Sequence, residues 1–234
     1  MSKARHLARF AAWLLPASPR KNALLRRLGH DVAPTATARS SVVWRVERIT
    51  LASGSRIGRW NLIKNMREIS IAEKASIGRL NVVSSHPVYA RLYPDGASLR
   101  VADHGKITSR HHLDCSGGVT VGSFASVAGS GTTLLTHSVD LRRDAQVARP
   151  ISVGAYSFVG ARCMVLGGAV LPDRSVLGAG SVLTRSREER TAGLWAGVPA
   201  AHRGSVAGKW FERAETHTRR VYVPATGETV EDAF

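Results

Sequence analysis

The chain has 234 residues, and 44% of them are hydrophobic, which is enough for one sizeable domain with short appendages. No apolar run approaches the ~20 residues of a membrane-spanning helix, and the two cysteines, Cys115 and Cys163, do not make a disulfide framework, so we expect a cytoplasmic protein. The net charge of +16 invites a nucleic-acid-binding interpretation, but the aromatic content is only 6% and no matching motif is present, so we expect no nucleic-acid partner.

The first predicted element is a short helical arm over residues 1–40, which begins with a basic segment. Up to His30 it carries seven Lys or Arg residues and no acidic residue, with Phe10 and Trp13 among them. Such an arm either packs against the main domain as a solvated basic helix or lies on an anionic membrane surface. We favour packing, whereas the alternative predicts a peripheral contact with the inner face of the membrane. A basic surface also suits an anionic cofactor or substrate.

Residues 41–186 repeat a pattern with a period of six. A four-residue strand motif recurs five times, at Ile49–Ala52, Ile69–Ala72, Leu99–Ala102, Val119–Gly122 and Ile151–Gly154. Successive motifs start 20, 30, 20 and 32 residues apart, so a coil of three six-residue steps and two further residues carries insertions in two places. Because this period fits neither an α-helix nor a simple alternating strand, we predict an all-β, parallel β-helix of about six coils. The inserted loops are expected near residues 84–98 and 136–150.

The residue two positions before each apolar anchor is small, as at Ser55 before Ile57. Alternate residues of a strand face the same way, so this small side chain should share the interior with its anchor. Cys163 occupies such a position, and we predict that it is structural rather than a nucleophile. His111, two residues before Leu113, is an exception, because a large polar ring inside the coil needs a hydrogen-bond partner.

Several segments resemble the hexapeptide-repeat acyltransferases, most closely the acetyltransferases of exopolysaccharide and colanic-acid biosynthesis. The resemblance covers about residues 21–203 and rests on the motifs ITSRHHLDCSGGVTVG (107–122), LLTHSVD (134–140), VGAYSFVG (153–160), VLPDRSVLGAGSVLTR (170–185) and AGVPA (196–200). It implies a left-handed coil and transfer of an acetyl group from acetyl-CoA to a hydroxyl of a sugar or polysaccharide precursor. It also implies a homotrimer with active sites between subunits.

The period of six stops at residues 134–140, and this break places His137 at the base of an inserted loop rather than in the packed interior. The resemblance implies that His137 is the general base that removes a proton from the acceptor hydroxyl. A glutamate follows the histidine in related sugar acetyltransferases, but Gln146 stands at the corresponding position here. Asp140 is therefore the nearest carboxylate that would orient His137, with loop capping as its alternative role.

Acceptor contacts are predicted around the two adjacent histidines, of which only one can face the interior of a strand. The expected acceptor-binding residues are His111, His112, Asp114 and Gln146. A hydrogen-bonded structural role is the alternative for the inward histidine.

The resemblance places acetyl-CoA along the later coils, where small residues let the pantetheine approach the backbone. The expected contacts are Gly160, Ala161, Gly178, Ala179, Thr184, Arg185 and Arg203, the last of them with a phosphate. Glycine is also required at the corners of such a coil, so a purely structural role is the alternative for these glycines. No metal is expected.

Two other functions stay open. A metal-dependent hydratase of the γ-class carbonic anhydrase type needs three convergent zinc-binding histidines, and the spaced histidine pair of that family is absent. A non-enzymatic β-helix scaffold or membrane-surface binding module would act through the basic arm, since the fold needs no chemistry to be stable. Residues 187–234 are predicted to form a C-terminal segment and tail, to which the sequence assigns no function.

Overall fold

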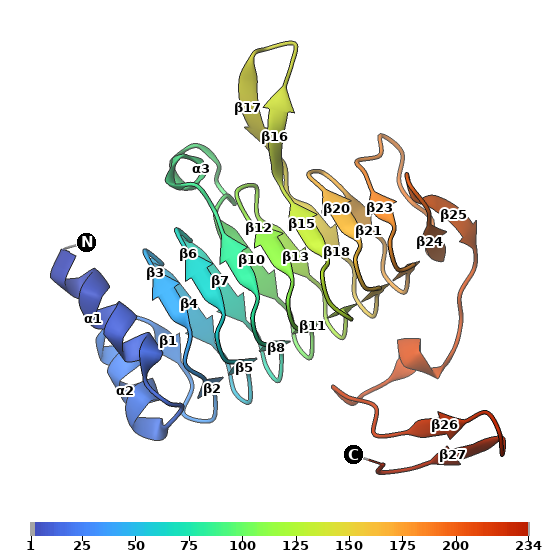
Figure 1. Cartoon of the computed structure of the whole chain (residues 1–234), viewed down its shortest axis with the longest axis horizontal. Coiled ribbons are helices and arrows are strands. Elements are labelled where there is room, and N and C mark those ends of the chain that lie inside the picture. The colour runs from blue at the N-terminus through green and yellow to red at the C-terminus, as the bar shows by residue number, and fades with distance from the viewer. Residues whose placement is uncertain (1–2, 234) are drawn as a thin grey trace.

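The structure is a computed structural model that describes residues 3–233. These residues form a left-handed parallel β-helix, with helices at its N-terminal end and a long tail at its C-terminal end (Figure 1). The mostly parallel, all-β architecture agrees with the fold predicted from the period of six.

Three parallel sheets form the sides of the coil. The first sheet contains β1 (Asp31–Val32), β4 (Arg48–Leu51), β7 (Glu68–Ile71), β10 (Ser98–Val101), β13 (Val119–Val121), β18 (Ile151–Val153) and β21 (Val170–Leu171). The second sheet contains β2 (Thr37–Ala38), β5 (Arg56–Ile57), β8 (Ser76–Ile77), β11 (Lys106–Ile107), β14 (Ser126–Val127), β19 (Phe158–Val159) and β22 (Val176–Leu177), followed by β24 (Leu194–Ala196) and the antiparallel β25 (Ala201–Gly204). The third sheet contains β3 (Val42–Trp44), β6 (Leu62–Lys64), β9 (Val82–Ser84), β12 (His112–Asp114), β15 (Thr133–Leu135), β20 (Met164–Leu166) and β23 (Val182–Leu183).

Seven coils stack within residues 3–233, slightly more than the predicted six. The additional coil is the first one, because β1 pairs in parallel with β4 and starts well before the predicted boundary at residue 41. Its interior anchors, Val32 and Ala38, are buried like those of the later coils. The arm therefore ends earlier than predicted, because the first coil lacks the strand motif by which the others are recognised.

The register of the first sheet confirms the spacing of the strand motifs. Ile69 lies between Ile49 of one neighbouring strand and Leu99 of the other, and Val119 lies between Leu99 and Ile151. The extra residues of the two long intervals leave the coil as loops, so the anchors stay aligned.

The interior is filled by the anchors and by the small residues that precede them. Ile57 and Ile77 are fully buried, and so are Ser55 and Ala75. Cys163 is 1% exposed in an equivalent position, and burial raises the pKa of its thiol, as expected for a structural cysteine. Each fully buried Ile, Leu or Val side chain stabilises the fold by roughly 1.5–3 kcal/mol relative to an exposed one.

A ladder of polar side chains runs inside the coil at the corner between the second and third sheets. Each member accepts a hydrogen bond from the backbone N–H of the member one coil further on, from Ser41 through Asn61, Asn81, His111 and Thr132 to Cys163. His111 Nδ1 accepts from Thr132 N at 3.2 Å, and burial lowers the pKa of His111 to about 4. Because His111 is only 2% exposed, the acceptor-binding role predicted for it is wrong, and its role in the ladder is structural.

Two helices, α1 (Lys3–Leu14) and α2 (Pro19–Arg27), cover the N-terminal end of the coil. Two of their basic residues are buried: Arg9 donates to the carbonyls of Leu28, Val46 and Glu47, and Lys21 donates to those of Trp13 and Leu15. The helical part of the arm therefore packs against the domain, as favoured above, and its charge satisfies backbone carbonyls. No helix within residues 3–233 has the length and hydropathy needed to cross a bilayer.

Two insertions leave the coil, as predicted, and both leave it at the corner between the third and first sheets. The first contains helix α3 (Pro87–Leu92), and the second is the hairpin of β16 (His137–Asp140) and β17 (Ala145–Ala148). Both project from the same edge of the coil in Figure 1. They contact each other, because Ala148 N donates to Tyr93 Oη at 3.3 Å.

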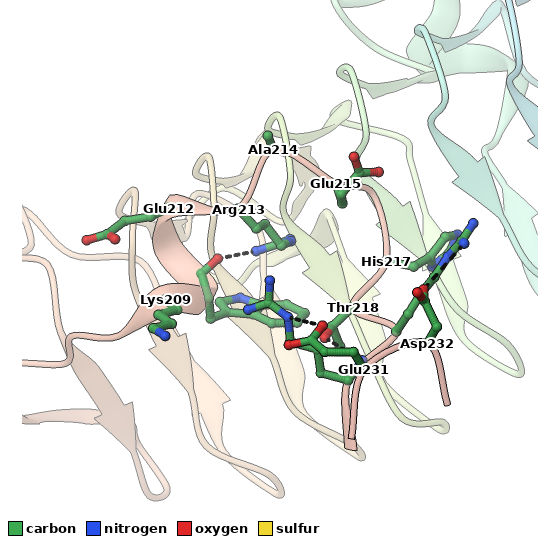
Figure 2. Close-up of a pocket in the computed structure, with 12 residues that line it drawn as sticks. Lys209, Glu212, Arg213, Ala214, Glu215, His217, Thr218, Glu231 and Asp232 are labelled. Atoms are coloured by element: carbon green, nitrogen blue, oxygen red, sulfur yellow. Dashed lines mark hydrogen bonds and ion pairs between the residues drawn. The ribbon is translucent and has the colours of Figure 1, made fainter. Parts of the chain in front are cut away.

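The tail runs back along the second sheet instead of continuing the coil. It contains a short 3-10 helix, η1 (Lys209–Glu212), and a hairpin of β26 (Val221–Val223) and β27 (Glu228–Val230). Trp210 packs edge-on against Phe158 of β19 at 5.7 Å between ring centroids, and the Arg213 guanidinium lies 3.8 Å from the Trp210 ring centroid. Tail residues of both charges line a cavity of about 890 Å³ beside η1 (Figure 2).

Candidate active site

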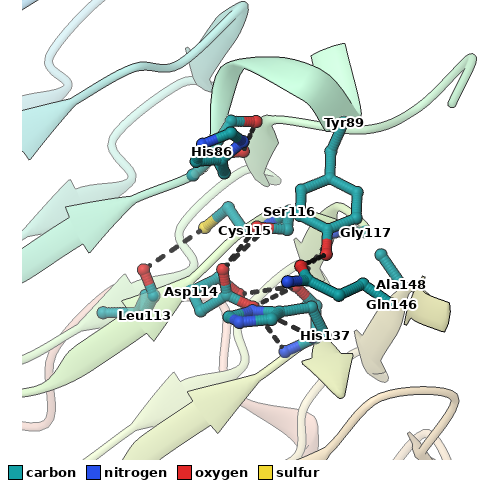
Figure 3. Close-up of polar contacts among 12 residues, drawn as sticks. His86, Tyr89, Leu113, Asp114, Cys115, Ser116, Gly117, His137, Gln146 and Ala148 are labelled. Atoms are coloured by element: carbon teal, nitrogen blue, oxygen red, sulfur yellow. Dashed lines mark hydrogen bonds and ion pairs between the residues drawn. The ribbon is translucent and has the colours of Figure 1, made fainter. Parts of the chain in front are cut away.

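Asp114, the last residue of β12, is the centre of a hydrogen-bond network below the hairpin (Figure 3). Its Oδ1 accepts from Ser116 Oγ at 2.6 Å. Its Oδ2 accepts from the backbone N–H groups of Thr136 at 2.9 Å and His137 at 3.0 Å, and Thr136 Oγ1 lies 2.6 Å from the same oxygen. Two adjacent coils thus hold the carboxylate in one position.

His137 is the first residue of β16, where the chain leaves the coil. Its Nδ1 lies 2.8 Å from Asp114 Oδ2, which is within hydrogen-bonding distance. The His137 side chain is 41% exposed, whereas that of Asp114 is 9% exposed. The imidazole therefore has one edge against a buried carboxylate and another edge open to a ligand.

The pKa of Asp114 is lowered, although burial by itself would raise it. Hydrogen bonds from Ser116, Thr136 and His137 outweigh the burial, so the carboxylate stays ionised at neutral pH. An ionised carboxylate can only accept, so Asp114 favours the imidazole tautomer that carries its proton on Nδ1 and leaves the Nε2 lone pair free. A base that acts through Nε2 needs this tautomer.

A residue of the first insertion packs beside the imidazole. The ring centroid of Tyr89 in α3 lies 5.9 Å from that of His137, and Tyr89 Oη donates to Gln146 Oε1 at 2.7 Å. Burial raises the pKa of Tyr89, so the phenol is neutral and can donate. The two insertions thus meet directly beside His137. Sequence reasoning missed Tyr89, whose only signal was its position inside an insertion.

The sequence-based prediction that Asp140 orients His137 is wrong. The Asp140 carboxylate binds Arg143 Nη1 at 2.6 Å and accepts from the backbone N–H of Arg142 at 3.1 Å, both within the hairpin turn. The hydrogen bond from Arg143 lowers the pKa of Asp140. Asp140 therefore has the capping role named as its alternative, and Asp114 is the carboxylate beside the imidazole.

The remaining predicted acceptor residues lie in different surroundings. Gln146 lies on β17 and is held by Tyr89, beside the imidazole. His112 is exposed and faces away from the interior of the third sheet, opposite to His111. Within residues 3–233 no three His, Cys, Asp or Glu side chains converge as metal ligands do.

The residues predicted to contact acetyl-CoA fall on two different corners of the coil. Those between the second and third sheets are Gly160, Ala161, Gly178 and Ala179. Those that follow β23, at the same corner as His137, are Thr184 and Arg185. Arg203 lies in β25, where its Nε donates to Ala196 O at 3.4 Å. Ala196 in turn packs on the first group, because a β-carbon at Gly178 would lie 3.1 Å from Ala196 Cβ.

Arg149 is a further residue of this corner that the sequence did not indicate. Its backbone N donates to Thr136 O at 2.8 Å, next to His137. The side chains of Arg149 and Arg185 flank Gly168, where a β-carbon would lie 3.3 Å and 3.0 Å from their respective Cδ atoms. Within the described part of the chain neither arginine pairs with a carboxylate, so two cationic side chains stand free beside the candidate site.

Comparison with known proteins agrees with this architecture. Residues 150–185 match the family model described as the hexapeptide repeat of succinyl-transferase. The polysialic acid O-acetyltransferase OatWY is 16% identical, with a TM-score of 0.53 over 76% of this chain and 86% of that one. These likenesses show the fold. A second similar structure is AntD, an N-acyltransferase from Bacillus cereus, solved as a variant with dTDP-4-amino-4,6-dideoxyglucose and coenzyme A. It is 15% identical, with a TM-score of 0.53 over 84% of this chain and 94% of that one. No curated protein sequence matches the chain.

Proposed function

We propose that this protein is an O-acyltransferase that transfers an acetyl group from acetyl-CoA to a hydroxyl of a sugar or polysaccharide precursor. The observation that carries the proposal is the contact of 2.8 Å between His137 Nδ1 and the buried Asp114 carboxylate, with the imidazole 41% exposed. The match to a transferase repeat and the shared fold with acyltransferases of saccharide and nucleotide-sugar substrates support it.

His137 moves the proton in the proposed reaction. Asp114 holds the Nδ1–H, so Nε2 accepts the proton of the acceptor hydroxyl as its oxygen attacks. Acetyl-CoA supplies the thioester carbonyl carbon to which that oxygen bonds. His137 then returns the proton to the departing sulfur, which leaves the base and its tautomer as they began. Asp114 is a positioning residue, because it acts on the imidazole and not on the substrate.

The corner of His137 has features that suit coenzyme A. Arg149 and Arg185 offer two unpaired guanidinium groups for its phosphates. A β-carbon at Gly167 would lie only 2.6 Å from Thr136 O. Because glycine has no β-carbon, the backbone of the next coil can approach the His137 strand closely at this point. Thr184 precedes Arg185 at this corner and belongs to the same proposed surface.

We extend the proposal to a homotrimer with its sites between subunits. The predicted donor contacts divide between two corners that the third sheet separates, with Gly160 and Gly178 on one and Arg185 on the other. One ligand reaches both groups only if a second copy brings its own corner against the first. Sedimentation velocity of the purified chain tests this, and a monomer at assay concentrations would contradict it.

The function is tested by thiol release from acetyl-CoA with a panel of saccharide acceptors. His137→Ala should reduce acceptor-dependent thiol release by about 10²- to 10⁴-fold, the usual contribution of a general base. His6→Ala removes an imidazole from α1 at the far end of the coil and serves as the matched control. Full activity of His137→Ala would show that the base is assigned wrongly.

A further inference from the structure

A basic groove of about 480 Å³ lies on the outer face of the second sheet, over the first four coils. Its charged lining consists of Arg39, Arg56, Arg59, Arg79 and Lys106, with His217 of the tail at one end. None of the described residues that line it is acidic, and none is Phe, Tyr or Trp.

Four of the five cations form two rows along the axis of the coil. Arg56 and Lys106 both align with Ser76 of β8, one strand to either side. Arg59 and Arg79 each follow two residues after their strands, β5 and β8. Neighbouring strands lie about 4.8 Å apart. The charges of Arg59 and Arg79 therefore follow each other at about that spacing, and those of Arg56 and Lys106 at about twice that spacing.

These charges have no counterion within the described part of the chain. No carboxylate pairs with any of the five, and Lys106 Nζ contacts His217 Nδ1, another nitrogen base. Burial and the charge of Arg213 lower the pKa of Lys106 to about 8. A row of uncompensated cations raises the local concentration of anions and attracts an anionic ligand.

The groove and the donor corner lie on opposite sides of the His137 coil. The groove spans β2, β5, β8 and β11, all N-terminal to the coil that carries His137, whereas Gly168 and Arg185 belong to later coils. Along the axis of the coil, an acceptor in the groove and a donor along the later coils would therefore lie on opposite sides of His137.

We infer that this groove binds the anionic part of the saccharide acceptor, so that the substrate class is an acidic glycan. The inference rests on the proposed function. In the proposed trimer the groove of one copy would serve the site of a neighbouring copy, because the second sheet does not border the corner of His137 in its own chain.

The lining favours a saccharide over other polyanions. Ser76 and Ser109 place hydroxyl groups among the cations, which suits a ligand that carries hydroxyls as well as charge. A single-stranded nucleic acid would need aromatic platforms for its bases, and the described lining offers none apart from His217. A bilayer would need exposed apolar side chains, whereas the only large apolar residues of the lining, Ile77 and Ile107, are buried.

Binding of a labelled oligogalacturonate, an acidic sugar chain, to the full chain tests the inference by fluorescence polarisation. The methyl-esterified form of the same oligosaccharide is the neutral comparison. We expect binding of the acidic form alone, weakened by added salt. Arg59→Gln with Arg79→Gln should weaken it about three- to tenfold, because two exposed charge contacts are lost.

Arg27→Gln with Arg187→Gln removes the same charge from exposed positions outside the groove and should leave binding unchanged. Equal binding of the neutral oligosaccharide, or an undiminished affinity of the Arg59/Arg79 variant, would overturn the inference. Tighter binding of single-stranded DNA or of phosphatidylglycerol vesicles through the same two arginines would also overturn it. His137→Ala should keep oligogalacturonate binding while losing thiol release, so the two proposals fail separately.

Discussion

Asp114 and His137 come from adjacent coils: Asp114 Oδ2 accepts a hydrogen bond from the backbone N–H of His137 and lies 2.8 Å from its Nδ1. One carboxylate oxygen therefore holds both the backbone of the strand that carries His137 and the imidazole ring of that residue. A change at Asp114 should affect stability and reactivity together, whereas a change at His137 should affect reactivity alone.

Asp114→Asn is expected to lower kcat by about 10²-fold or more, because a neutral amide no longer selects the imidazole with a free Nε2. It should also lower the free energy of unfolding by roughly 1–3 kcal/mol, since an amide donor would face the N–H of Thr136. Thiol-release kinetics and thermal denaturation measure the two effects. Asp140→Asn, which removes only a hairpin cap, should keep nearly full activity, and the reverse pattern would restore the sequence-based hypothesis.

The buried histidine of the ladder should make stability depend on pH. The pKa of His111 is lowered from 6.5 to about 4 in the folded protein, so the unfolded chain binds more protons below pH 6.5. The free energy of unfolding should therefore be unaffected above that pH and fall by up to about 3 kcal/mol as the pH drops toward 4. His30, whose pKa burial lowers to about 3, should add to the same loss.

His111→Asn separates the contribution of His111 from that of His30. Asparagine already occupies this ladder position at Asn61 and Asn81, where its Oδ1 accepts the next backbone N–H. The variant should fold and lose less stability than the parent chain between neutral and mildly acidic pH. Denaturation curves at several pH values measure this, and an unchanged pH dependence would refute the assignment.

Tyr89→Phe should loosen the contact between the two insertions. The variant keeps the ring beside His137 but loses the hydrogen bond to Gln146, which contributes about 1 kcal/mol locally. Faster amide hydrogen exchange in β16 and β17, with the coil unaffected, is the expected result. Tyr222→Phe in the exposed tail hairpin is the matched control, and equal exchange in both variants would argue against the contact.

Gly78→Ala should destabilise the coil more than a typical exposed substitution. A β-carbon at Gly78 would overlap the carbonyl oxygen of Thr108 in the next coil, so the backbones could not stay in register. Gly227 has open space around it, and only its φ of 72° disfavours an alanine there. Gly227→Ala should therefore lower the free energy of unfolding by about 1 kcal/mol. Urea denaturation of the two variants compares them, and a milder effect at Gly78 would contradict the close approach.

The sequence by itself determined the coil, its register and the two places where the chain leaves it. These features follow from a period of six, because each anchor recurs at a constant distance along the chain and must be buried directly above the previous one. The position of His137 outside the packed interior followed from the same pattern.

Only the tertiary structure decided which side chains meet His137. Asp114 lies 23 residues away along the chain yet one strand away in space, whereas Asp140 lies three residues away and points into its own turn. The stacking of coils makes neighbours of residues about one coil apart, and the inserted helix brings Tyr89 to Gln146 over 57 residues. Proximity along the chain therefore misled the assignment of the orienting carboxylate, because in a coil the nearest partner is usually found in the adjacent turn.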